Sequence, residues 1–321
     1  MTKAGRRGLT PSFLRARLAK LAVGWWDMRA LELVCLGIVA LYIAVRLRRR
    51  GDESATSLLT RFVWLAITSA IGEDSMIRLH GFYDYAPGWS LPLDRVPILI
   101  VLIWPIVIDS ASGLAAGLCG ALGWPPRPRN LALLSAAVVF VDAWLIEPIA
   151  TQSGLWRWHA PGLFGVPPIG VLGWAVFAGW VVWLRPHLGS AALPLGPRLL
   201  RMGLASLVAL LGTHAVLIAA WWGLLRPLSA PISVPAGITV AWLVLAPLSL
   251  WFLRAGTGRF VPRIDLLVRV PAAAFFFVLL SVRRAELGAQ AGPLLIYALA
   301  FALPYWVLVF ARRQPVAAVG R

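Results

Sequence analysis

Three carboxylic acids stand inside or at the end of long apolar runs in this sequence. Glu73 closes one run, Asp142 lies in the middle of another, and Glu147 follows it just before Pro148. A carboxylate at membrane depth is costly and is seldom kept without a partner or a function. Apolar surroundings favour the neutral form of such a group, which can then donate a proton. These three residues are therefore the predicted acid or base groups of a site.

Structural roles for these acids stay open as an alternative. Residues five positions apart lie about 140° apart around a helix, so Asp142 and Glu147 do not share a face unless Pro148 distorts the turn. Each acid can instead cap a helix, pair with an arginine or accept hydrogen bonds from Trp and Tyr across a bundle. For a fourth acid, Asp109 near the end of its run, we expect such a structural role.

Two loops that follow the acids carry pairs of aromatic residues. Tyr83 and Tyr85 lie after the second apolar run, and Trp156 and Trp158 lie after the fourth. In extended backbone, residues two apart face the same side. Loops that follow even-numbered runs lie on one side of a membrane, so the four aromatics can jointly close one substrate-binding cavity. The alternative is an interfacial belt of Trp and Tyr.

One histidine accompanies each aromatic pair, His80 in the first loop and His159 in the second. We expect both at the mouth of the site, where one of them can position a water molecule. Their separation has no HxxH or HxxxH spacing, and Cys35 and Cys119 form no CxxC motif, so no metal site is predicted. The sequence also has no Walker loop and no GxGxxG before a helix, so no nucleotide cofactor is expected.

Long apolar runs are the elements that must position these residues. The 321-residue chain is 60% apolar and only 13% charged, which excludes a soluble domain. A run of about 20 apolar residues spans a membrane as a helix. We predict an all-α fold, a polytopic integral membrane helical bundle of eight or nine transmembrane helices, with candidate spans at residues 30–47, 58–72, 96–118, 130–150, 169–184, 202–225, 236–253, 266–282 and 292–310.

Basic residues set the expected orientation of these spans. The chain has 30 Lys and Arg against 13 Asp and Glu, a net charge of +17. Most lie at the ends of apolar runs, where we expect contact with anionic lipids and no nucleic-acid binding. Arg61 and Arg269 lie within candidate spans, near an end where a long side chain can snorkel. Loops after odd-numbered runs are richer in Lys and Arg, which predicts that they are cytoplasmic.

The chain is predicted to form one bundle with two short extensions. Residues 1–29 are a basic amphipathic segment expected on the membrane surface, residues 30–310 are the bundle, and residues 311–321 are a short basic tail. With nine spans, the basic N-terminal segment lies opposite the cytoplasmic loops. Either eight helices cross, therefore, or the first run does not. The expected location is a bacterial inner (cytoplasmic) membrane.

At these residues the sequence resembles the membrane carotenoid biosynthesis proteins, whose best-known members are the CruF-type carotenoid hydratases. The similarity covers about residues 61–184. It is carried by Gly72-Glu73, Tyr83, Tyr85, Val96-Pro97, Trp104, Asp142, Glu147-Pro148, Gly154, Trp156-Arg157-Trp158, Gly165-Val166-Pro167 and Gly173-Trp174.

The resemblance implies an enzyme that adds water across the terminal double bond of an acyclic carotenoid end group. Two positions depart from the family pattern. Glu147 stands where the family usually has Asp, which keeps the carboxyl group and lengthens its reach. Gly170 stands where the family usually has Asn, which removes an amide that could orient water or a carboxyl group.

The chemistry of alkene hydration fits the residues themselves. A proton delivered to carbon gives a tertiary cation, which water then captures. Asp142 or Glu147 is the expected proton donor, and facing Trp and Tyr rings would stabilise the cation. The expected partner is a hydrophobic polyene or isoprenoid from the bilayer, and other carotenoid pathway enzymes are further expected partners. A non-catalytic lipid- or pigment-binding membrane protein, or a transporter, is the alternative.

Overall fold

The computed structural model of the protein describes residues 11–48, 54–188, 193–226 and 232–310. Within these ranges, nine helical segments are long and apolar enough to cross a membrane. The prediction of an all-α membrane bundle is confirmed. The helices are α1 (Pro11–Arg48), α2 (Ala55–His80), α3 (Ile98–Leu122), α4 (Pro128–Gln152), α5 (Pro168–Leu184), α6 (Leu195–Ala220), α8 (Val234–Arg254), α9 (Arg263–Leu267), α10 (Val270–Val282), α11 (Arg284–Leu287) and α12 (Ala291–Phe310).

Short elements complete these spans. Helices α9 and α10 share one span, and α11 and α12 share another. The remaining elements are the 3-10 helices η1 (Arg185–Leu188), η3 (Thr257–Arg259) and η4 (Gly288–Gln290), the π-helical turn η2 (Trp221–Leu225), and the strands β1 (Tyr83–Tyr85), β2 (Pro92–Leu93), β3 (Val96–Pro97) and β4 (Trp156–Trp158).

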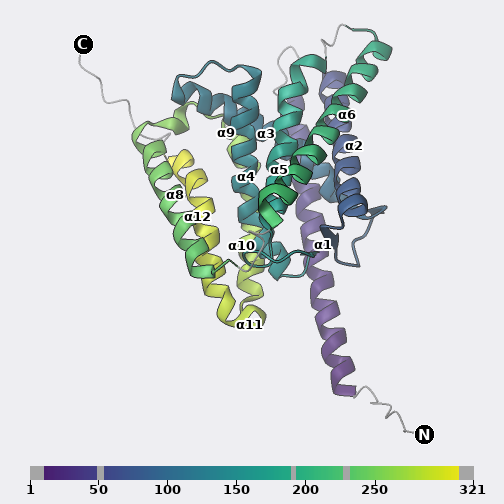
Figure 1. Cartoon of the computed structure of the whole chain (residues 1–321), viewed down its shortest axis with the longest axis vertical. Helices are drawn as coiled ribbons and strands as arrows, with labels where there is room; N and C mark the ends of the chain where they lie inside the picture. Colours follow the sequence, from purple (N-terminus) through teal and green to yellow (C-terminus); the bar gives the residue numbers. More distant parts are fainter. Residues whose placement is uncertain (1–10, 49–53, 189–192, 227–231, 311–321) are drawn as a thin grey trace.

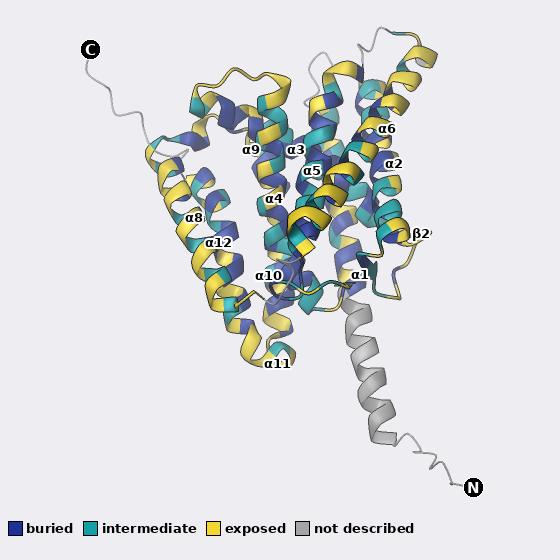
Figure 2. Ribbon diagram, in the orientation of Figure 1, coloured by how far each residue is buried: buried dark blue, intermediate teal, exposed yellow. Residues whose placement is uncertain are grey.

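The bundle has a buried centre and two lipid-facing edges. Helix α4 packs between α3 and α5, and α12 packs against both α8 and α4. Figure 1 shows α8 and α12 on one side of this centre and α2 and α6 on the other, with the first part of α1 projecting below the bundle. Helices α6 and α8 present mostly exposed residues in Figure 2, as expected for helices whose outer faces contact lipid.

Helix α1 joins two regions that the sequence analysis separated. It begins at Pro11 and continues past residue 29 to Arg48, because no proline interrupts the helix after its first residue. The beginning of the predicted amphipathic segment, residues 1–10, and the whole predicted tail, residues 311–321, lie outside the described residues. The surface location of the segment stays a prediction.

Helix α2 is longer than its apolar run, and this places Glu73 inside the helix. Polar residues ended the predicted run at residue 72, but the helix continues to His80 and ends at Gly81, which has a φ of 57°. Glycine adopts this left-handed conformation without a steric penalty. Asp74 and Arg78, one turn apart, form a 2.7 Å ion pair that suits the added turns.

A short antiparallel ribbon closes the end of the bundle where the loops after α2 and α4 meet. Strands β1 and β4 pair with Tyr83 opposite Trp158 and Tyr85 opposite Trp156. Because side chains alternate between the faces of a strand, these four aromatics lie on one face. The intervening Asp84 and Arg157 pair with each other in the register and face the other way.

Asp109 connects helices in the part of the bundle distant from the ribbon. Its carboxylate accepts a hydrogen bond from the Tyr42 hydroxyl and forms 2.9 Å ion pairs with Arg46 and Arg185. Arg46 also pairs with Asp265 at 3.1 Å. A buried carboxylate with two cationic partners agrees with the structural role expected of Asp109.

Candidate active site

A large cavity lies among α1, α3, α4, α10 and α12, and the aromatic ribbon forms one of its ends. Its volume is about 720 Å³, within the range of pockets that bind small molecules. Aliphatic and aromatic side chains make most of the wall. Glu73, Glu147 and Asp142 all line it, so the three predicted acid or base residues face one space.

Glu73 contacts three neutral donors from two elements, β1 and α3. The hydroxyl of Tyr83 donates to Glu73 Oε2, and the hydroxyl of Tyr85 lies 3.3 Å from the same oxygen. The indole Nε1 of Trp104 in α3 donates to Glu73 Oε1 at 2.8 Å. The two tyrosines belong to β1, so the ribbon holds their hydroxyl groups against the last turns of α2. These donors fix the carboxyl group in position without giving it a cationic partner.

Glu147 is surrounded by indoles. Trp156 and Trp158 of β4 donate their Nε1 hydrogens to the same oxygen, Oε2, at 2.7 and 2.8 Å. Trp174 of α5 also lines this part of the cavity. An indole is a donor only, so these rings orient Glu147 and cannot remove its proton. Only 2% of Glu147 is exposed, which keeps bulk water away from it.

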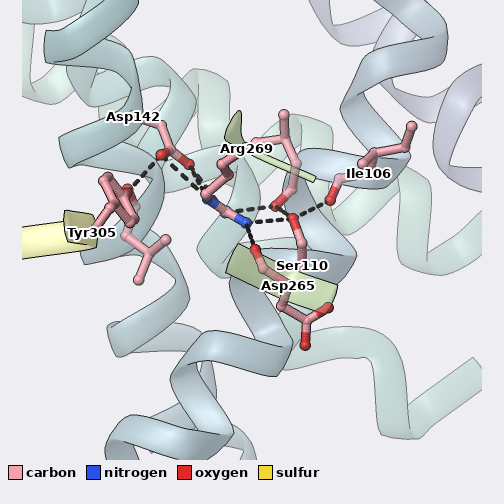
Figure 3. A network of polar contacts seen from close by, with 8 residues as sticks. Ile106, Ser110, Asp142, Asp265, Arg269 and Tyr305 are labelled. Atoms are coloured by element: carbon pink, nitrogen blue, oxygen red, sulfur yellow. Dashed lines mark hydrogen bonds and ion pairs between the residues drawn. The ribbon is translucent and has the colours of Figure 1, made fainter. Parts of the chain in front are cut away.

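Asp142 lies in a separate polar network within the same cavity (Figure 3). Its carboxylate forms a 3.1 Å ion pair with Arg269 of α10's span and accepts a 2.6 Å hydrogen bond from the Tyr305 hydroxyl of α12. Arg269 also donates to the Ser110 hydroxyl at 2.6 Å and to the Asp265 carbonyl at 2.9 Å. Among the described residues that line the cavity, Arg269 is the cationic side chain.

This network changes one expected role. The sequence analysis named Asp142 or Glu147 as the proton donor. Both carboxyl oxygens of Asp142 are occupied by Arg269 and Tyr305, so Asp142 is assigned a structural role in place of proton donation. Arg269 does not snorkel to an interface as expected, because a buried partner satisfies its charge. Glu147 is the better donor of the two.

Aromatic rings enclose the space between the two glutamates. The ring centroids of Tyr83 and Trp158 are 4.7 Å apart, and those of Tyr85 and Trp156 are 5.9 Å apart. Burial, and the nearby Glu73 and Glu147 charges, raise the pKa of Tyr85 well above its usual value. Tyr85 therefore stays a neutral hydroxyl donor. Ring faces and buried hydroxyls of this kind can stabilise a developing cation.

The two predicted histidines lie outside the site. His80 contacts His214 of α6 at 2.9 Å. His159 contacts the Asp84 carboxylate at 2.8 Å and the Gly81 carbonyl at 2.7 Å. In the described part of the chain, no histidine lines the cavity. We correct their expected role, because local polar partners hold each ring away from the aromatic end of the cavity.

The family of the chain follows from comparison with known proteins. Residues 29–245, about two thirds of the chain, match the family model described as "Carotenoid biosynthesis protein". The chain belongs to the carotenoid biosynthesis protein family. This match extends the predicted resemblance of residues 61–184 in both directions. Searches of curated proteins and of solved structures find no match. A role in carotenoid biosynthesis, in a membrane, therefore describes this protein.

Some site residues of this carotenoid biosynthesis protein were not assigned from its sequence. Trp104 and Trp174 belong to the motifs that carry the resemblance, but no role was given to them. Arg269 and Tyr305 lie beyond the matched region. The sequence feature that marks Arg269 is a basic residue inside an apolar run. Its partner Asp142 lies on another helix. A single sequence does not reveal that pairing.

Gly170 allows close packing at the site of the carotenoid biosynthesis protein. A Cβ atom at this position would lie 2.5 Å from the ring of Trp158, well inside van der Waals contact. The indole of Trp158 therefore occupies the space that a side chain at residue 170 would need. Glycine at residue 170 leaves room for the Trp158 ring in the position from which it donates to Glu147.

Proposed function

We propose that this carotenoid biosynthesis protein is a hydratase that adds water to the terminal double bond of an acyclic carotenoid. The observation that carries the proposal is the pair of buried glutamates, Glu73 and Glu147. Both line one apolar cavity, and both accept hydrogen bonds from neutral Trp and Tyr donors. Two like charges in a dry space disfavour the doubly ionised state. One glutamate can then hold a proton while the other accepts one.

Glu147 is the proposed acid. It transfers its proton to the less substituted CH carbon of the terminal double bond. The π electrons form the new C–H bond, so the positive charge lies on the carbon that bears the two methyl groups. The resulting tertiary cation lies among the rings of Tyr83, Tyr85 and Trp158. Each ring face can stabilise a desolvated cation by roughly 0.5 to 2 kcal/mol. General acid catalysis of this kind contributes about a hundredfold to ten-thousandfold in rate.

The substrate reaches this site from the bilayer through a side opening between α10 and α12. Val270, Ala274 and Val278 follow each other at intervals of four on α10, line the cavity and are exposed. On α12, Trp306 and Val309 also line the cavity and are also exposed. Residues four apart share a helix face, so two apolar faces form the edges of the opening. A polyene can therefore place one end in the site and leave its remainder in lipid.

The same cavity and opening also suit a membrane protein that binds a pigment or lipid without changing it. The apolar wall supports binding in either case. The glutamates separate the two functions, since binding a hydrocarbon does not need an acid. Their replacement therefore tests the hydratase proposal.

The experiment is expression of the protein in cells that accumulate an acyclic carotenoid such as lycopene, followed by mass analysis of the pigments. The proposal predicts a product heavier by one water, reduced roughly a hundredfold or more in Glu147→Gln. Glu286→Gln is the matched control, because Glu286 is 54% exposed in α11 and should leave the product unchanged. Unaltered pigment that copurifies with the wild-type protein would contradict the proposal and favour the binding protein.

A further inference from the structure

A second, smaller cavity adjoins the site on the side of α2, α5 and α6. Its volume is about 60 Å³. It has five lining residues in common with the main cavity, which form the wall between them: Glu73, Tyr83, Trp104, Trp158 and Trp174. Glu147 and Asp142 line the main cavity only. Glu73 alone among the acids in the described ranges faces both spaces.

The small cavity has the polarity and the room that water needs. Ser69 and Thr213 line it and are 1% and 3% exposed. Each hydroxyl donates its hydrogen to a carbonyl of its own helix at 2.7 Å. Their lone pairs can therefore accept hydrogen bonds from water, as can the carboxyl group of Glu73. A water needs roughly 10–15 Å³ and two to four polar partners, so a few waters fit.

Glycines give this cavity its space. Gly72, Gly170 and Gly173 line it. At Gly173 a Cβ atom would meet Leu217 at 3.5 Å, an ordinary contact. An alanine there fits without moving the backbone and takes its volume from the cavity. In the main cavity, by contrast, Asp142 already bonds to Arg269 and Tyr305, and the rest of the wall is mostly hydrocarbon.

We propose that the small cavity is the water-binding subsite of the enzyme and that Glu73 is the base that receives the proton of the attacking water. This inference rests on the proposed hydratase function. It divides the reaction between the two spaces: Glu147 protonates the polyene from the main cavity, and the water arrives from the opposite side of the wall. Glu73, which faces both spaces, joins the two steps.

The step balances in atoms and electrons. The Glu147 O–H bond breaks and its proton forms a C–H bond with the alkene, leaving a tertiary cation. A lone pair of the water oxygen then forms the C–O bond. The oxonium ion gives one proton to the Glu73 carboxylate, so the product is a tertiary alcohol. Transfer of a proton from Glu73 back to Glu147 restores the enzyme, and the net reaction consumes one water.

Two variants of the small cavity test the inference. Gly173→Ala reduces its volume, and Thr213→Val removes a water acceptor while keeping the side-chain shape. Gly203→Ala in α6 is the control, because a Cβ atom there meets nothing within 4 Å. The purified full-length proteins are incubated in liposomes with lycopene and D₂O. Mass analysis then measures both hydrated product and recovered alkene that has gained deuterium.

The inference predicts that Gly173→Ala and Thr213→Val lower the hydrated product at least tenfold while deuterium still enters the recovered alkene. Glu147 still protonates the substrate in these variants, and the uncaptured cation loses a proton again. Gly203→Ala should behave as the wild type. Full hydration in both variants would overturn the water subsite, and so would equal loss of hydration and exchange. A wild-type protein that neither hydrates nor exchanges would refute the hydratase function itself.

Discussion

Glu73 and Glu147 differ from the other buried acids in their partners. Asp109 and Asp142 contact guanidinium groups, whereas the two glutamates accept hydrogen bonds from phenol and indole donors. A guanidinium forms an ion pair that anchors a carboxylate to another helix, whereas a neutral donor only orients it. Residue type alone therefore did not separate a structural aspartate from a candidate acid. The partners of each carboxyl group do.

The Asp142–Arg269 pair is predicted to stabilise the bundle. Arg269→Met leaves a buried carboxylate without its cation, which typically costs about 3–5 kcal/mol. The variant should lose its fold at a lower temperature in detergent, as followed by fluorescence-detected size exclusion. Asp142→Leu combined with Arg269→Met removes both charges and should recover much of this loss. A single variant as stable as the wild type would contradict the structural role of the pair.

Gly170 is predicted to be required for the position of Trp158. In Gly170→Ala, the added Cβ atom would collide with the Trp158 ring, which lies 2.5 Å from its ideal position. The indole should then leave Glu147, and the yield of hydrated pigment should fall at least tenfold with normal protein abundance. Gly196→Ala is the control, because a Cβ atom meets nothing there within 4 Å. Equal yields from the two variants would show that Trp158 does not need this space.

Helices and ribbon follow the sequence pattern closely, and the differences have physical causes. Apolar runs predicted the spans, and the alternation of Tyr83 with Tyr85 and of Trp156 with Trp158 predicted that each pair shares a face. The predicted second span ended several residues before the end of α2. Glu73 and Asp74 interrupt the apolar run but do not break the helix. The cavity could not be predicted, because its walls come from helices whose mutual packing a single sequence does not specify.

The opening between α10 and α12 is predicted to admit the polyene. Ala274→Trp adds a large side chain to the exposed, cavity-lining face of α10, so it should lower kcat/KM about tenfold for a carotenoid supplied in liposomes, with thermal stability unchanged. Val282→Trp is the control on the same helix, at a residue that is 67% exposed and outside the lining. Unchanged kinetics in Ala274→Trp would place the entry elsewhere.

At the scale of the whole molecule, charge predicts which side of the membrane carries the site. The described parts of the loops after α3, α5 and α8 lie at the end of the bundle opposite to the loop after α2 (Figures 1 and 2), and these three loops belong to the set that is richer in Lys and Arg. Basic loops stay in the cytoplasm, so the ribbon end should face away from it. An odd number of spans, nine in the described ranges, places the start of the first span and the end of the last on opposite sides of the membrane.

Cysteine labelling of intact cells tests this orientation. Leu91→Cys lies in the loop after α2, is 63% exposed and should react with a membrane-impermeant maleimide from outside. Trp124→Cys, at the other end and 41% exposed in the native residue, should react only after the cells are permeabilised. The native Cys35 and Cys119 are buried, so the wild-type protein serves as the background. Labelling of both variants from one side would contradict the predicted topology.

The most direct test of the account is the reaction of the purified protein with an acyclic carotenoid in liposomes prepared in ¹⁸O-labelled water. Hydration through Glu147 predicts a tertiary alcohol that carries the labelled oxygen, formed by the wild type and absent from Glu147→Gln. An unlabelled pigment of unchanged mass in both samples, or equal labelled product from both, would contradict the central claim.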